Sequence, residues 1–184
     1  MLQLTDLHIS RLYNGRWTIE VVSASNALGV DLIAVTGDLI DGSITDRVRD
    51  IDALGDLRAT AGVYVIPRNH EYFFDSEAWM QHFVSLGMVP LANSHIVIER
   101  REAQVVLAGV TDITAAETGL PPPDLPYALA GAPGHAPVIL LDHQPRSARR
   151  GGVMPASYDC RSRLESCHHG IEVHGQLRHL VAGF

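Results

Sequence analysis

The stretch that decides the fold class of this 184-residue chain is Leu32-Ile33-Ala34-Val35-Thr36-Gly37-Asp38. Its first five residues carry no charge, and a continuous apolar run of this kind is typical of a strand covered on both faces. Gly37 allows the backbone to turn sharply as the strand ends. Asp38 then stands at the carboxyl end of the strand, where a polar side chain is available for chemistry.

The same pattern, an apolar run followed by polar residues, recurs along the chain. Further buried strands are expected at 2–5, 63–66 and 138–141, and short strands near 95–99 and 105–108. Apolar residues at three- and four-residue steps predict helices at 17–27, 44–54 and 76–86. Strands alternating with helices indicate an α/β fold with a mostly parallel sheet.

Polar residues follow four of these strands. They are Asp6, His8, Asp38, Asp41, Asn69, His70, Asp142 and His143. Because sites gather at the carboxyl ends of the strands in such sheets, we expect these side chains to lie close together. Each cluster alone has an ordinary explanation, such as a turn, a helix N-cap or a buried histidine. Their shared position after strands favours a site.

The residue types at these strand ends suit metal-assisted chemistry. Asp6 and His8 are expected on the same side of an extended segment, and carboxylate with imidazole suits Mn, Fe or Zn better than Ca or Mg. Asp38 has two oxygens and can bridge two ions, while Asn69 and His143 offer an amide oxygen and a nitrogen. Two such ions would clamp a phosphoryl group.

Three further residues are candidates for moving or directing protons. His70 is expected to donate a proton to the leaving oxygen as general acid. Asp41 and Glu71 are expected to orient His70 or a ligand histidine.

Composition limits the other classes of function. The chain is 46% hydrophobic, and its net charge of −7 argues against a general nucleic-acid or anionic-membrane binder. It contains no apolar run near the ~18–20 residues of a membrane span and no signal segment, so a cytoplasmic location is the default expectation. The abrupt start at Met1 suggests missing upstream segments, and with them the protein would be membrane-associated or exported.

The motifs together resemble the calcineurin-like metallophosphoesterase superfamily, in the bacterial branch often attached to a membrane or exported. The matches are Asp6-Leu7-His8 to D-x-H, Gly37-Asp38-Leu39-Ile40-Asp41 to G-D-x-x-D, Asn69-His70-Glu71 to G-N-H-E/D, and Leu140-Leu141-Asp142-His143 to a later strand that ends in a ligand histidine. The resemblance covers about residues 2–150, and the combined motif is highly specific.

The resemblance implies a truncated, metallophosphatase-type four-layer αββα sandwich of two mixed sheets flanked by helices. It also implies a binuclear, metal-dependent phosphoric ester hydrolase in which a metal-bridging hydroxide hydrolyses phosphomonoesters or phosphodiesters. One metal ion would bind Asp6, His8 and Asp38, and the other would bind Asp38, Asn69 and His143. The implied partner is a small phosphoester substrate. The sequence indicates no nucleic acid and leaves the oligomeric state open.

Two departures from the family pattern stand out. Arg68 replaces the glycine before Asn-His-Glu, so it either reaches the substrate phosphate or strains Asn69, and Arg146 is a second candidate for the phosphate. The composition changes near Gly151, which divides the chain into a metallophosphoesterase core (1–150) and an atypical tail (151–184). The tail is expected to complete the second sheet. Within it, His169 is the best match to the terminal ligand motif, with His174 as an alternative.

The unusual composition of this tail has three alternative interpretations. A reading-frame shift near Gly151 would explain its composition. A chain without the last ligands would be a catalytically impaired remnant that binds metal weakly or acts as a scaffold. A zinc site is a third interpretation, although its spacing matches no standard pattern; its residues would be Cys160, Cys167, His169 and His174.

Overall fold

Strands and helices alternate along the chain, as the apolar runs predict. The computed structural model describes residues 1–143 and the strand 170–173. In chain order the elements, with η for a 3-10 helix, are β1 (Leu2–Thr5), α1 (Gly15–Ala27), β2 (Ile33–Val35), α2 (Ile44–Ile51), η1 (Asp52–Asp56), β3 (Val63–Val65), α3 (Asn69–Phe73), α4 (Ser76–Ser85), β4 (Val89–Pro90), β5 (Ser94–Arg100), β6 (Ala103–Gly109), η2 (Ile113–Thr118), α5 (Leu125–Ala128), β7 (Val138–Leu141) and β8 (Gly170–Val173).

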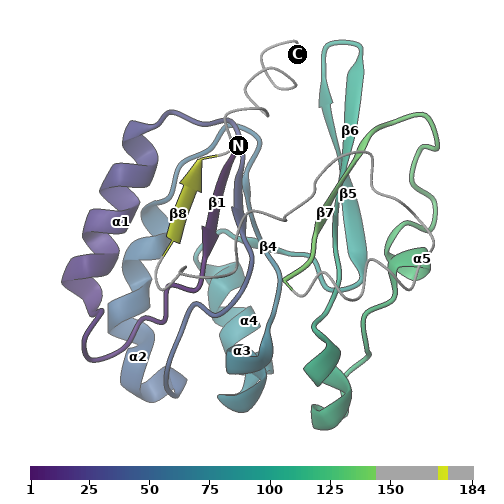
Figure 1. The fold of residues 1–184 in the computed structure, drawn as a ribbon. Helices are drawn as coiled ribbons and strands as arrows, with labels where there is room; N and C mark the ends of the chain where they lie inside the picture. The colour runs from purple at the N-terminus through teal and green to yellow at the C-terminus, as the bar shows by residue number, and fades with distance from the viewer. Residues whose placement is uncertain (144–169, 174–184) are drawn as a thin grey trace.

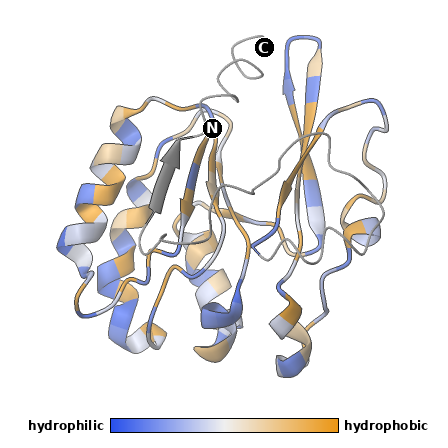
Figure 2. Ribbon diagram, in the orientation of Figure 1, coloured by the Kyte–Doolittle hydropathy of each residue, from blue (hydrophilic) through white to orange (hydrophobic). Residues whose placement is uncertain are grey.

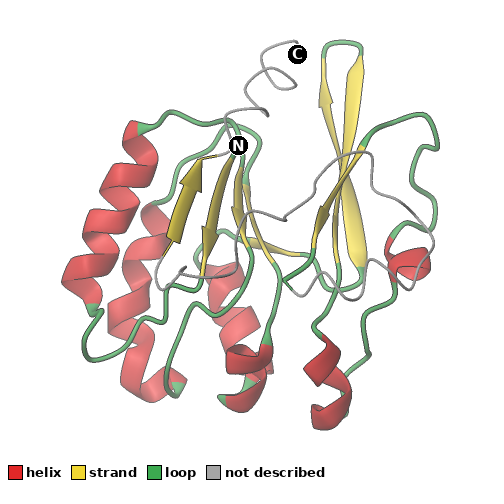
Figure 3. Cartoon of the chain, in the orientation of Figure 1, coloured by secondary structure: helices red, strands yellow, loops and turns green. Residues whose placement is uncertain are grey.

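The strands form two mixed sheets. The first has the order β4-β3-β2-β1-β8, in which β1 to β4 are parallel and β8 is antiparallel to β1. The second has the order β5-β6-β7, with β5 antiparallel and β7 parallel to β6. Helices α1 and α2 cover the outer side of the first sheet, and α5 lies beside the second (Figures 1 and 3). The predicted α/β sandwich of two mixed sheets flanked by helices is confirmed.

The one strand of the tail that the structure describes belongs to the five-stranded sheet. Strand β8 pairs with β1, with Leu2 opposite Val173 and Thr5 opposite Gly170. Residues 170–173 therefore extend the five-stranded sheet, and the expectation that the tail completes the second sheet stays a prediction. The expectations for Arg146, for the histidines and cysteines of the tail, and for the boundary at 150 lie outside the described residues.

Strand β2 is covered on both faces, as its apolar run predicts. Ile33 and Val35 lie in the core between the first sheet and the helices, with Trp79 and Phe83 of α4. Ala34 points the other way and joins a second core between the sheets, which includes Leu107 and Leu141. Alternate side chains of a strand face opposite sides, and Figure 2 shows mostly apolar strands beside helices of mixed polarity.

Several boundaries differ from the predicted ones. Helix α1 begins at Gly15, because the side chain of Asn14 accepts a hydrogen bond from the Arg16 N–H and caps the helix. The helix predicted to reach residue 54 ends at Ile51 and tightens into η1. Asn69-His70-Glu71 begins a short helix, and the short elements β4, η2 and α5 carry too little periodicity to be predicted.

Candidate metal centre

The loops after four strands bring the predicted ligands together. Asp6 follows β1, Asp38 follows β2, Asn69 begins α3 beyond β3, and His143 follows β7. Within the described residues, two groups have potential ligand atoms all within 4.8 Å of one another: His8, Asp38 and His70, and Asp6, Asp38 and His143. Asp38 belongs to both groups, but the groups differ from the predicted ligand sets, because Asp6 is grouped with His143 and His8 is grouped with His70.

The backbone that carries the first ligands is not extended. Asp6, His8 and Asp38 have φ angles of 53°, 43° and 53°, in the left-handed region that residues other than glycine rarely adopt. The loops hold this shape by pairing, since the His8 N–H donates to the Asp38 carbonyl at 2.9 Å. The expectation that Asp6 and His8 share one side of an extended segment is therefore wrong, although both reach the site. Such strain is typical of functional sites.

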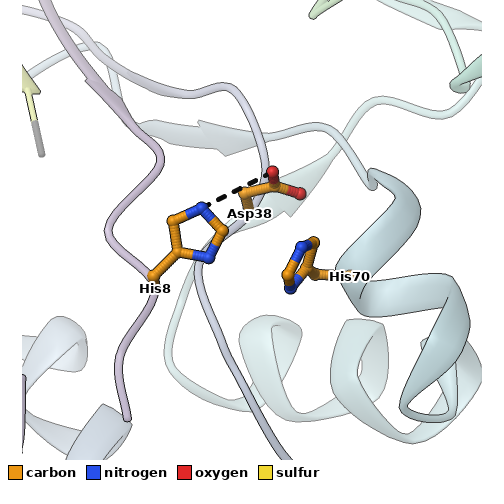
Figure 4. Close-up of side chains that lie close together, drawn as sticks. All are labelled: His8, Asp38 and His70. Carbon is orange, nitrogen blue, oxygen red and sulfur yellow. Dashed lines mark ion pairs between the residues drawn. The ribbon is translucent and has the colours of Figure 1, made fainter. Parts of the chain in front are cut away.

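Asp41 lies between the two histidines of the first group. Its Oδ1 is 2.6 Å from Nδ1 of His70 and 3.1 Å from Nδ1 of His8. The two rings meet edge to face with centroids 4.7 Å apart, and Nε2 of His8 lies 3.8 Å from Oδ2 of Asp38 (Figure 4). With Nδ1 of each ring donating to Asp41, both Nε2 atoms are available for a ligand or a proton.

Two buried oxygens, one of Asp38 and one of Asn69, lack a hydrogen-bond partner and therefore most need a cation. Asp38 is only 2% exposed, and its Oδ1, like Oδ1 of Asn69, is buried without a hydrogen-bond partner. A buried carboxylate oxygen without a partner is costly. Nδ1 of His143 lies 2.8 Å from the Thr36 carbonyl oxygen, which leaves Nε2 available to bind a metal ion. These donors fit a divalent metal ion.

Glu71 binds backbone rather than a histidine. Its carboxylate accepts hydrogen bonds from the N–H groups of Leu39 at 2.8 Å, Arg68 at 3.0 Å and Asp38 at 3.3 Å. Burial raises the pKa of Glu71 to about 7; the N–H groups of Leu39 and Arg68 oppose the rise, and the nearby Asp38 carboxylate adds to it. This corrects the expectation that Glu71 orients a histidine: it ties the loop after β2 to the start of α3.

Arg68 points into the site. Its Nη1 donates to Oδ1 of Asp6 at 3.2 Å and to Oδ2 of Asp38. Gly37 (φ +90°) makes room for the stem, because a Cβ added there would lie 2.6 Å from Cβ of Arg68. The structure thus places the guanidinium on two predicted metal ligands, a position the sequence analysis did not foresee.

Two further contacts were also missed from the sequence. The Thr36 carbonyl orients His143, and the Thr5 hydroxyl donates to Oδ2 of Asp6. A backbone carbonyl leaves no mark in the sequence, and a threonine at a strand end is too common to be a signal.

Comparison with known proteins identifies the family. The family model for the calcineurin-like phosphoesterases matches residues 1–176. A zebrafish (Danio rerio) transmembrane protein with metallophosphoesterase domain is 31% identical over 82% of this chain and 36% of its own length. A cattle (Bos taurus) protein of the same description is 35% identical over 80% of this chain and 35% of its own. An uncharacterized metallophosphoesterase of Helicobacter pylori strain J99 is 30% identical, over 81% and 39%.

The chain belongs to the calcineurin-like phosphoesterase family. It spans between about a third and two fifths of the length of these relatives. No helix among the described residues combines the length and the apolar character needed to cross a membrane.

Proposed function

We propose that this chain is a metal-dependent phosphoesterase domain that hydrolyses phosphomonoesters or phosphodiesters. The observation that carries the proposal is the pair of buried, unpartnered oxygens, Oδ1 of Asp38 and Oδ1 of Asn69, at the ends of neighbouring parallel strands. Membership of the calcineurin-like phosphoesterase family supports the same chemistry. Attachment to a membrane through segments upstream of Met1 stays a prediction.

The ligands would be Asp6, His8, Asp38, Asn69 and His143, and the mixed oxygen and nitrogen donors suit Mn, Fe or Zn. Bound divalent ions supply Lewis acidity toward phosphoryl oxygens and activate water near neutral pH. The resemblance implies two ions, and His169 as a further ligand stays a prediction because it lies outside the described residues.

His70 is the proposed general acid. Its Nδ1 is held 2.6 Å from the Asp41 carboxylate, which fixes the direction of the ring. Nε2 can then give a proton to the leaving oxygen of the ester. Asp41 acts through His70, so it is a positioning residue and not a group that touches the substrate.

The experiment compares metal content and turnover in the same samples. Chelator-treated protein should lose hydrolysis of an aryl phosphodiester, and added Mn²⁺ should restore it. Asp38→Asn, which keeps the side-chain shape, should abolish both turnover and tight metal binding, while Asp56→Asn at an exposed site should change neither. Turnover that survives complete metal removal would refute the proposal.

One observation favours a second candidate function. Because the Arg68 guanidinium already binds Asp6 and Asp38, the chain could be an impaired remnant that binds metal weakly. Metal-loaded protein that hydrolyses no mono- or diester under Mn²⁺ excess would support that candidate over the enzyme.

A further inference from the structure

Arg68 forms the contacts that a metal ion would otherwise make with two carboxylates. Its Nη1 binds Oδ1 of Asp6 and Oδ2 of Asp38. The exposed fraction of the side chain is 18% for Arg68, 25% for Asp6 and 3% for Asp38. A buried carboxylate requires a counter-charge. Arginine supplies a permanent one, because its guanidinium does not lose its proton at any physiological pH.

Two neighbours, Gly37 and Glu71, hold the side chain in this position. Gly37 lacks the Cβ that would collide with the Arg68 stem. The Arg68 N–H donates to Glu71, which anchors the residue as the N-cap of α3. The contact is therefore built into the loops and does not depend on a free surface side chain folding back.

The remaining oxygens divide into two kinds. Both oxygens of Asp6 are engaged, Oδ1 by Arg68 and Oδ2 by the Thr5 hydroxyl. By contrast, Oδ1 of Asp38 and Oδ1 of Asn69 are buried and unpartnered. His143 belongs to one ligand group with Asp38 and Asp6. A cation is thus already present at Oδ1 of Asp6 and Oδ2 of Asp38, while Oδ1 of Asp38 and Oδ1 of Asn69 still lack one.

We propose that the Arg68 guanidinium is a resident cation of the centre, so that this chain binds one divalent ion, at Asp38, Asn69 and His143, where two would otherwise fit. A second ion between Asp6 and Asp38 would lie beside the guanidinium, and like charges in a partly buried site repel strongly. The proposal rests on the proposed function for the premise that the centre binds metal.

The test is the number of Mn²⁺ ions per chain in wild type, Arg68→Met and Arg47→Met. Methionine keeps most of the arginine stem and removes the charge. Arg47 is the matched control, because its ion pair with Asp50 is also partly buried but does not touch the centre. Chelator-treated proteins are dialysed against Mn²⁺, and elemental analysis is paired with electron paramagnetic resonance, which separates an isolated ion from a coupled pair.

We expect about one ion with an isolated signal in wild type and in Arg47→Met, and about two ions with a coupled signal in Arg68→Met. Two ions in wild type, or one ion in every variant, would overturn the role of Arg68 while leaving metal-dependent hydrolysis intact. If no variant binds metal and none turns over ester, the proposed function fails with it. If the methionine variant does not fold, Arg68→Gln replaces it in the comparison. The number of Mn²⁺ ions bound per wild-type chain can by itself reject the proposal.

Discussion

Replacement of Gly37 by alanine should be unusually costly, for two separable reasons. Gly37 has φ +90°, and holding a residue with a Cβ in the left-handed region costs about 1–2 kcal/mol. The added Cβ would also lie 2.6 Å from Cβ of Arg68, and a backbone-proximal atom cannot move away cheaply. Overpacking of this kind costs about 1–3 kcal/mol, so Gly37→Ala should lower the free energy of unfolding by about 2–5 kcal/mol.

The two contributions can be measured apart by urea unfolding in the presence of a chelator. Gly87→Ala is the matched control, because Gly87 has φ +85° with nothing within 4 Å of an added Cβ; it should cost only the conformational ~1–2 kcal/mol. In an Arg68→Gly background the excess cost of Gly37→Ala should disappear, as a double-mutant cycle reports. Equal costs for both alanines, or an excess that persists without Arg68, would refute the close contact.

Three other predictions concern the site and the core. Glu71→Gln should lower the free energy of unfolding by about 1.5–3 kcal/mol, because an NH2 group would replace an oxygen that accepts hydrogen bonds from backbone N–H groups. An unchanged urea midpoint would argue that these hydrogen bonds do not stabilise the loops. Asp41→Asn should reduce kcat/KM for an aryl phosphodiester about 10–100-fold through loss of histidine orientation, whereas exposed Asp56→Asn should not. Phe83→Ala, at a fully buried position, should cost about 3–5 kcal/mol, and Val84→Ala, 51% exposed on the same helix, should cost less than about 0.5 kcal/mol.

The sequence by itself determined the fold class and predicted which residues would gather at the ends of the strands. Apolar runs such as 32–36 are local, and the requirement that a doubly covered strand be apolar at every position can be read directly. Because parallel strands end at one edge, the residues after them had to meet. Asp6 and Asp38 follow two such strands of one sheet, whereas His143 follows β7 of the second sheet. All three were predicted from the sequence as ligands, and the structure brings their side chains within reach of one another.

Only the tertiary structure decided what surrounds those ligands. Arg68 is 62 residues from Asp6 and 30 from Asp38 in the chain, so no periodicity relates them. The direction of its side chain follows from the N-cap backbone of α3 and from the space left at Gly37. Likewise, Glu71 binds N–H groups of another loop. Contacts between loops depend on how strands are stacked in space, and that information is distributed over the whole chain.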